Sequence, residues 1–204
     1  EFSRYLFRLG YMNPYLIPPK QMPKLHPEAP YFFSEDELSL FFRKCDSYYA
    51  ENPGPRMRGI IMPALFRVLY CCGLRPKEAR MLPYGNVNLA GKYIDILQSK
   101  GPKSRRIFIS DELVSYLMLY DSQVSAMLPE REYFFPADID KPYSVQALCY
   151  NFGLIWKKAF PEWSGKMPRI YDLRHHFAWA AINRWAREGT DVNAMLPYLM
   201  RYMG

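Results

Sequence analysis

Two arginines carry the chemistry that this sequence suggests. Arg75 lies in the segment Gly-Leu-Arg-Pro-Lys-Glu and Arg174 in the segment Tyr-Asp-Leu-Arg-His-His, and Lys100 lies between them in a lysine-bearing turn. A guanidinium group is planar, stays protonated, and can donate two hydrogen bonds to one phosphate. Two such groups and a lysine are suited to stabilising the charge that builds up on a phosphate during its transfer. The pattern therefore predicts a phosphoryl-transfer site.

These segments, taken together and in this order, resemble the catalytic domain of tyrosine recombinases, the phage and transposon integrase family. The resemblance runs from about Pro30 to Gly204. It implies that Arg75, Lys100 and Arg174 are catalytic and that Glu78 supports the site.

The chain departs from the family at the position three residues before the second arginine. The family usually has histidine or lysine there, and this chain has Tyr171, which the resemblance places among the catalytic residues. A phenol can donate a hydrogen bond but is a poor proton shuttle near neutral pH. His175 matches a histidine that commonly follows the second arginine, so we expect a supporting role. One of the two histidines, His175 or His176, is an alternative substitute for the histidine missing at Tyr171. Consecutive helix positions point about 100° apart, so only one of them can face the same phosphate as Arg174.

The C-terminal residues resemble a family segment that continues into a histidine and, further on, into the nucleophilic tyrosine. Residues 195–204 match the part of this segment before the histidine. The resemblance thus implies that no nucleophile lies in this chain and that the fragment is inactive in cleavage. Tyr198 and Tyr202 are the in-chain candidates, because tyrosine is a legitimate covalent catalyst. Their spacing is more typical of helix packing or surface positions.

The mechanism implied by the resemblance is DNA strand cleavage and rejoining through a 3′-phosphotyrosyl intermediate, without a metal or a cofactor. The implied assembly is a tetramer on double-stranded DNA for the full-length protein and a monomer for the isolated fragment. Two alternatives remain open. One is a nicking and closing enzyme like the type IB topoisomerases, and the other is a helical DNA-binding protein without catalysis.

Composition agrees with a polyanionic partner. The net charge is +7 and the isoelectric point is near 9.2. Clustered basic residues are the usual footprint of DNA binding, and we assign that role to Lys77, Lys103, Arg105 and Arg106. The four cysteines contain no C-x-x-C pair, which argues against a zinc site. The sequence has no run of 18 apolar residues and no signal-peptide pattern, so we predict a cytoplasmic protein without a membrane span.

The fold must bring these positions together. We predict a mainly helical domain with a small antiparallel sheet. Residues 1–30, which are rich in proline, are expected to be the end of a preceding DNA-binding domain plus a linker, and residues 31–204 the recombinase catalytic domain, incomplete at its C-terminus.

Local signals predict the individual elements. Ser34 and Glu37 form a capping-box pattern before a helix that ends near residue 51. An apolar helix is expected over residues 60–73, and a new helix begins at Pro76. Residues 92–97 and 105–109 predict a β-hairpin that presents Lys100. We expect further helices over 111–127, 144–160, from 172 and over 191–203, and a loop at 134–136.

Overall fold

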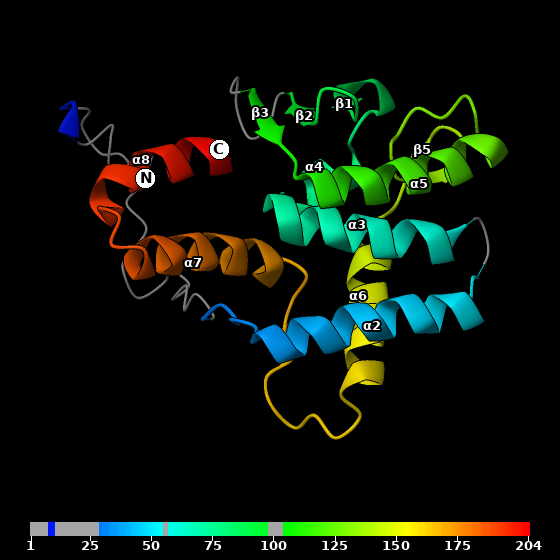
Figure 1. The fold of residues 1–204 in the computed structure, drawn as a ribbon, viewed down its shortest axis with the longest axis horizontal. Helices are drawn as coiled ribbons and strands as arrows, with labels where there is room; N and C mark the ends of the chain where they lie inside the picture. The colour runs from blue at the N-terminus through cyan, green and yellow to red at the C-terminus, as the bar shows by residue number, and fades with distance from the viewer. Residues whose placement is uncertain (1–7, 11–28, 55–56, 98–103) are drawn as a thin grey trace.

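The computed structural model describes residues 8–10, 29–54, 57–97 and 104–204 (Figure 1). The prediction for residues 1–30 therefore falls largely outside the described residues, as do Lys100 and Lys103. The helices are α2 (Glu35–Glu51), α3 (Arg58–Cys72), α4 (Pro76–Arg80), η2 (Tyr84–Asn86), α5 (Asp111–Met127), α6 (Val145–Ala159), α7 (Asp172–Arg187) and α8 (Val192–Met203). The strands are β1 (Val87–Asn88), β2 (Tyr93–Ile96), β3 (Arg105–Phe108), β4 (Pro136–Asp138) and β5 (Lys141–Pro142).

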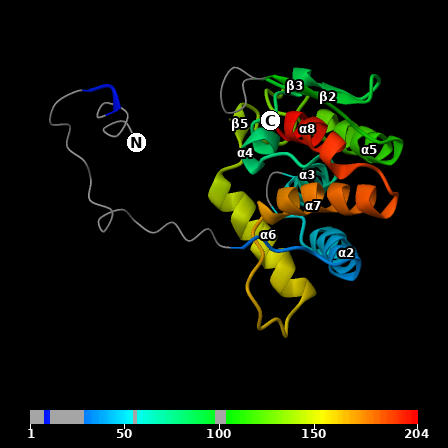
Figure 2. The ribbon, with the colours of Figure 1, turned by 90° about the vertical axis from the view of Figure 1, so that its left-hand side faces the viewer.

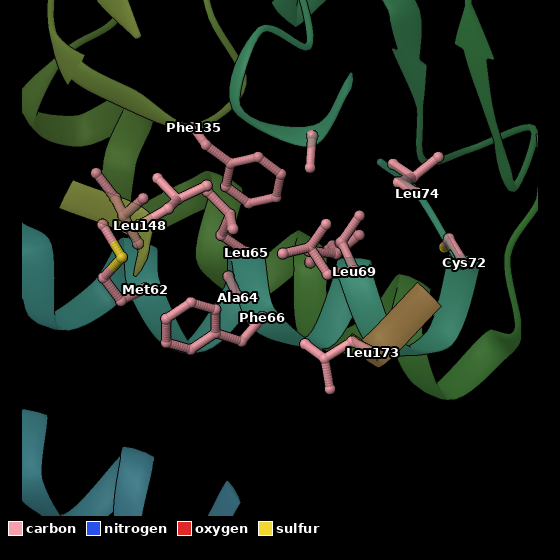
Figure 3. Close-up of a cluster of buried hydrophobic side chains, with 14 of the residues drawn as sticks. Met62, Ala64, Leu65, Phe66, Leu69, Cys72, Leu74, Phe135, Leu148 and Leu173 are labelled. Atoms are coloured by element: carbon pink, nitrogen blue, oxygen red, sulfur yellow. The ribbon is translucent and has the colours of Figure 1, made fainter. Parts of the chain in front are cut away.

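Helix α3 runs through the centre of the fold. It packs against α2, α5 and α7 on different sides (Figure 1). Most of its side chains are apolar and buried, whereas Arg67 reaches the surface and pairs with Asp46 of α2. Figure 3 shows Leu65 and Phe66 of α3 among side chains from distant segments, including Phe135, Leu148 and Leu173. The apolar run over residues 60–73 thus forms the core helix that the sequence predicts.

The start of α2 confirms the predicted capping box. The Ser34 hydroxyl accepts a hydrogen bond from the Glu37 N–H, and the Glu37 carboxylate accepts one from the Ser34 N–H. These bonds satisfy two donors that a helix N-terminus leaves unpaired. The predicted helix and the observed one end at the same residue, Glu51.

A group of rings, which we call the aromatic cluster, packs where α6 crosses behind α2. It consists of Tyr31, Phe33, Trp156, Phe160 and Trp163. Trp156 lies at its centre, is fully buried, and contacts the Phe160 ring at a centroid distance of 4.4 Å. Most of these pairs are edge-to-face or tilted, which is the arrangement that ring quadrupoles favour. The cluster anchors the entry to α2 onto α6.

The predicted hairpin is present and is part of a three-stranded antiparallel sheet of order β1-β2-β3. Ile94 pairs with Ile107, and both are buried. The short strand β1 is an addition that the sequence analysis did not predict. The expected loop at residues 134–136 is wrong in part, because Pro136 begins β4, which pairs with β5. Proline has no N–H to donate to a neighbouring strand. It is tolerated in this ribbon because both of its two short strands are edge strands.

Helix α8 brings the C-terminal residues back to the sheet. Its bounds confirm the helix predicted over residues 191–203, with the Asp191 carboxylate accepting hydrogen bonds from the N–H groups of Asn193 and Ala194. Figures 1 and 2 show its end beside β3 and α4. In the described part of the chain, no helix combines the length and the apolar character needed to cross a membrane.

Candidate active site

Arg75 is positioned by the sharp junction between α3 and α4. Gly73 ends α3 with a φ of 60°, a left-handed conformation that glycine adopts readily, and Pro76 begins α4. Between them, Arg75 is extended. Its N–H donates to the Glu78 Oε2 at 2.8 Å and its Nη1 donates to the Glu78 Oε1 at 2.7 Å. One carboxylate therefore fixes both ends of Arg75.

Arg174 reaches the same carboxylate from the first turn of α7. Its side chain is almost fully buried, and its Nη1 lies 3.9 Å from the Glu78 Oε2. The same nitrogen donates to the Gly73 carbonyl at 2.8 Å, and Nη2 donates to the Met203 carbonyl at 2.6 Å. The N–H of Arg174 bonds to the Tyr171 carbonyl, so the guanidinium group, and not this amide, presents donors to a ligand.

A third arginine joins them from the sheet. Arg105 donates from Nη1 to the Glu78 Oε1 at 3.0 Å and from Nη2 to the Glu78 Oε2 at 2.7 Å. From the sequence we predict a DNA-binding role for Arg105, and its contact with Glu78 is not predicted. Strand alternation was the available signal, since a period of two places Arg105 on the same face as the buried Ile107. We call Arg75, Glu78, Arg105 and Arg174 the arginine cluster.

The electrostatics of this cluster favour an anion. Three guanidinium charges and one carboxylate charge leave an excess of two positive charges in a mostly buried space. Burial and the charge of Arg75 lower the pKa of Arg174, with Glu78 acting in the opposite direction. Burial would also lower the pKa of Arg75, but the hydrogen bond and charge of Glu78 raise it above its ordinary value. A bound phosphate would relieve the repulsion among the arginines.

Tyr171 lies in the site and His176 does not. Arg75 donates a hydrogen bond to the Tyr171 phenol, and the His175 ring packs on the Tyr171 ring at a centroid distance of 5.2 Å. His176 instead packs between Phe33, Tyr70 and Trp179 in the interior. The structure thus brings together Arg75, Tyr171 and Arg174, with His175 beside them, and it places His176 away from the arginine cluster.

The predicted DNA-binding lysines and arginines have different surroundings. Lys77 lines a pocket of about 690 Å³ together with Arg75 and Glu78. Arg106 points to the opposite face of β3 from Arg105, where it pairs with both Asp95 carboxylate oxygens and lies over the Tyr93 ring. Lys100 and Lys103 lie outside the described residues.

The two tyrosines near the C-terminus, Tyr198 and Tyr202, have different surroundings. The Tyr202 hydroxyl donates to the Cys72 carbonyl at 3.1 Å, and its ring stacks on Phe177. Burial raises the pKa of Tyr202, which opposes formation of the attacking oxyanion. Tyr198 is exposed. These placements agree with the packing and surface roles expected from the sequence.

Across the described residues, no three histidine, cysteine, aspartate or glutamate side chains come together as a metal site would require. The groups that meet around Glu78 are guanidinium groups, a carboxylate, a phenol and backbone carbonyls. Such a set can bind phosphate oxygens and stabilise charge on them.

A comparison of the sequence with protein families decides the assignment. The profile of the phage integrase family matches residues 32–195, which include Arg75, Glu78, Arg105, Tyr171 and Arg174. The chain belongs to the phage integrase family. This confirms the tyrosine recombinase resemblance on which the sequence analysis rested.

Individual relatives and solved structures are also similar to this chain. The protein y4rE of Sinorhizobium fredii (strain NBRC 101917 / NGR234), named as an integrase/recombinase, is 29% identical over 177 residues, which cover 86% of this chain and 56% of the relative. The crystal structure of the XerA recombinase superposes with a TM-score of 0.64 at 21% identity and covers 99% of this chain and 63% of that one. The XerH site-specific recombinase bound to its difH substrate gives a TM-score of 0.63 at 18% identity, over 86% of this chain and 47% of that one.

These comparisons confirm the predicted fold class, which is mainly helical with small antiparallel sheets. This member of the phage integrase family spans little more than half the length of y4rE.

Proposed function

We propose that this protein acts in site-specific recombination of double-stranded DNA, cleaving and rejoining strands through a 3′-phosphotyrosyl intermediate. The observation that carries the proposal is the meeting of Arg75 and Arg174 at Glu78, although they come from different helices. Paired guanidinium groups on a shared carboxylate are oriented before the substrate arrives. Such preorganised donors stabilise a transition state without the cost of reordering.

In the proposed reaction, a tyrosine oxygen attacks the scissile phosphorus as the bond from phosphorus to the 5′ oxygen breaks. The leaving 5′ oxygen takes a proton and becomes a hydroxyl group. Attack by a 5′ hydroxyl on the phosphotyrosyl bond then reverses these steps and frees the tyrosine. Because each bond that breaks is replaced by a similar bond, no external energy source is needed.

The proposed roles follow the geometry. Arg75 and Arg174 bind the nonbridging phosphate oxygens, Glu78 holds both arginines, and Tyr171 steadies Arg75 by accepting its hydrogen bond. His175 supports Tyr171 by ring packing. We assign protonation of the leaving oxygen to Lys100, as the family resemblance implies, and place the attacking tyrosine beyond Gly204.

We also propose the remaining organisation. Residues 31–204 form the catalytic domain, and residues 1–30 are the end of a DNA-binding domain and its linker. Four protomers of the full-length protein act together on two DNA sites, and the 204-residue chain alone is a monomer without cleavage activity. Lys77 and Arg106 contribute contacts to the DNA backbone, which position the protein without reading the sequence.

The test uses the full-length protein, expressed from the complete gene. Wild-type protein is first used to select, from a randomised duplex library, the DNA that becomes covalently linked to it. Arg174→Ala should lower the rate of covalent linkage by about 1000-fold or more, because it removes a donor that acts on the transition state. DNA affinity, measured by fluorescence anisotropy, should fall by less than about 10-fold.

Arg187→Ala is the matched control, because it removes the same charge from an exposed position at the other end of α7. It should cleave at the wild-type rate. Absence of any covalent adduct with wild-type protein, or equal cleavage by wild-type and Arg174→Ala, contradicts the proposal and favours a DNA-binding protein without catalysis. Relaxation of a supercoiled plasmid without strand exchange would point to the topoisomerase-like alternative.

A further inference from the structure

Arg105 has an environment unlike that of a residue that only touches DNA. Its side chain is 8% exposed, and it donates to both oxygens of Glu78. Its Nε is buried and has no hydrogen-bond partner within the described part of the chain. An arginine that contacts the DNA backbone alone would keep its donors at the surface. The donors of Arg105 are instead directed at a carboxylate inside the site.

The carboxylate that Arg105 contacts is shared. Glu78 also accepts from Arg75, and it lies 3.9 Å from Arg174, a distance at which charges attract but no hydrogen bond forms. If Arg105 were absent, the negative charge of Glu78 would be balanced by Arg75 and Arg174 alone. A carboxylate and a phosphate use the same donors of a guanidinium group. Glu78 would then compete with the substrate for Arg174.

The net charge of the arginine cluster also indicates that Arg105 takes part in the site. With Arg105, the four side chains carry an excess of two positive charges, and without it they carry one. A DNA phosphodiester has one negative charge, and it acquires a second when a tyrosine oxyanion attacks it. The cluster with Arg105 therefore matches the charge of the transition state, whereas the cluster without it matches only the ground state.

We propose that Arg105 is a positioning residue of the active site, which neutralises and orients Glu78 so that Arg75 and Arg174 stay available to the scissile phosphate. This inference rests on the proposed strand-cleavage function. The sheet fixes the arrangement, because Arg105 pairs with Ile96 in register and Ile107 anchors the same face of β3 in the core.

The experiment uses the full-length protein and the duplex selected by wild-type protein as described above. Arg105→Ala should slow covalent linkage by roughly 100-fold while changing DNA affinity by less than about 3-fold, because the ground-state charge is still matched. The decisive variant is the double substitution Arg105→Ala/Glu78→Gln. It removes the competing charge as well, and it should cleave at least about 10-fold faster than Arg105→Ala alone.

Arg67→Ala is the matched control for loss of a partly buried ion pair. Arg67 pairs with Asp46 at 2.6 Å, between α3 and α2. This variant should lower the melting temperature but leave the cleavage rate per folded molecule unchanged. Arg105→Lys keeps the charge without the two-pronged contact and should fall between wild-type and Arg105→Ala.

The outcomes separate the two proposals. If wild-type protein forms no covalent adduct with DNA, the proposed function is wrong, and so is the role proposed for Arg105. If wild-type protein cleaves, the inference is wrong when Arg105→Ala cleaves equally fast, or when the double substitution is no faster than Arg105→Ala. Should Arg105→Ala fail to fold, as judged by circular dichroism, the comparison of Arg105→Lys with Arg105→Lys/Glu78→Gln replaces it. Rescue by the second substitution again supports the inference, and its absence contradicts it.

Discussion

The arginine cluster and the aromatic cluster are both largely buried, and both join segments that are far apart in sequence, but they are built on opposite principles. Each contact between Trp156 and its neighbouring rings stabilises the folded state. Arg75, Arg105 and Arg174 repel one another, and the Glu78 carboxylate together with backbone carbonyls holds them in place. The first region stabilises the fold, whereas the second uses that stability to hold like charges close together.

This difference indicates where function is located in the molecule. Burying a charge is unfavourable unless the charge is paired with one of opposite sign. Where positive groups outnumber negative ones, the protein alone does not compensate the whole desolvation penalty. A site with an excess of buried positive charge is therefore arranged for a ligand of opposite charge. Substitutions in the aromatic cluster should change stability, and those in the arginine cluster should mainly change cleavage.

The largest effect on stability is expected for Trp156→Ala. Trp156 is fully buried, and the substitution would leave a cavity among Phe33, Phe160 and Trp163. We expect a loss of about 3–5 kcal/mol in the free energy of unfolding. Trp156→Phe should cost less, on the order of 1–2 kcal/mol, because it keeps a ring in place and removes an indole N–H that is buried without a partner within the described residues. Urea denaturation followed by circular dichroism measures both, and equal losses would contradict this account.

Gly73→Ala should have the next largest effect, because Gly73 lies between Arg174 of the arginine cluster and the Phe177 ring. Its carbonyl accepts a hydrogen bond from Arg174, its φ is 60°, and a Cβ added to it would lie 2.6 Å from the Phe177 ring. We expect a loss of about 2–4 kcal/mol in the free energy of unfolding from backbone strain and overpacking.

Gly153→Ala is the control for Gly73→Ala. Gly153 lies within α6, and a Cβ there meets only the end of Met167 at 3.6 Å. Alanine is a better helix former than glycine, so this variant should be as stable as wild-type or more stable. If the two substitutions lowered the melting temperature equally, the junction at Gly73 would have no special role in placing Arg174.

The two regions also differ in what the sequence could predict. Helix α2, helix α3 and the β2–β3 hairpin followed from capping, apolar periodicity and turn residues, all of which act between near neighbours. Arg75 and Arg174 were assigned from motifs. The place of Arg105 in the cluster was missed, because it depends on how the sheet packs onto α4. The ribbon of β4 and β5 was missed for a similar reason, since two strands this short carry almost no periodic signal.

The adjacent histidines show the same limit at the scale of single residues. Helix geometry predicted that only one of them could face the phosphate, but not which one. The structure places the His175 ring on Tyr171 and the His176 ring against Phe33 and Tyr70. Which side of α7 is buried depends on the aromatic residues that pack against it from the segment before α2 and from α3. Adjacent residues of one helix thus face different surroundings: His175 lies beside Tyr171, and His176 contacts Phe33 of the aromatic cluster.

The smallest expected effect is a pH dependence that originates in His176. Burial lowers its pKa from the ordinary value of about 6.5, and its Nδ1 has no hydrogen-bond partner within the described residues. The unfolded chain therefore binds a proton more readily than the folded one. Stability from this group is complete above about pH 6.5 and is lost as the pH falls below it. His176→Phe should flatten the decline of the melting temperature between about pH 6.5 and 5. The same decline in both proteins would show that the carboxylates, and not this imidazole, control acid stability in that range.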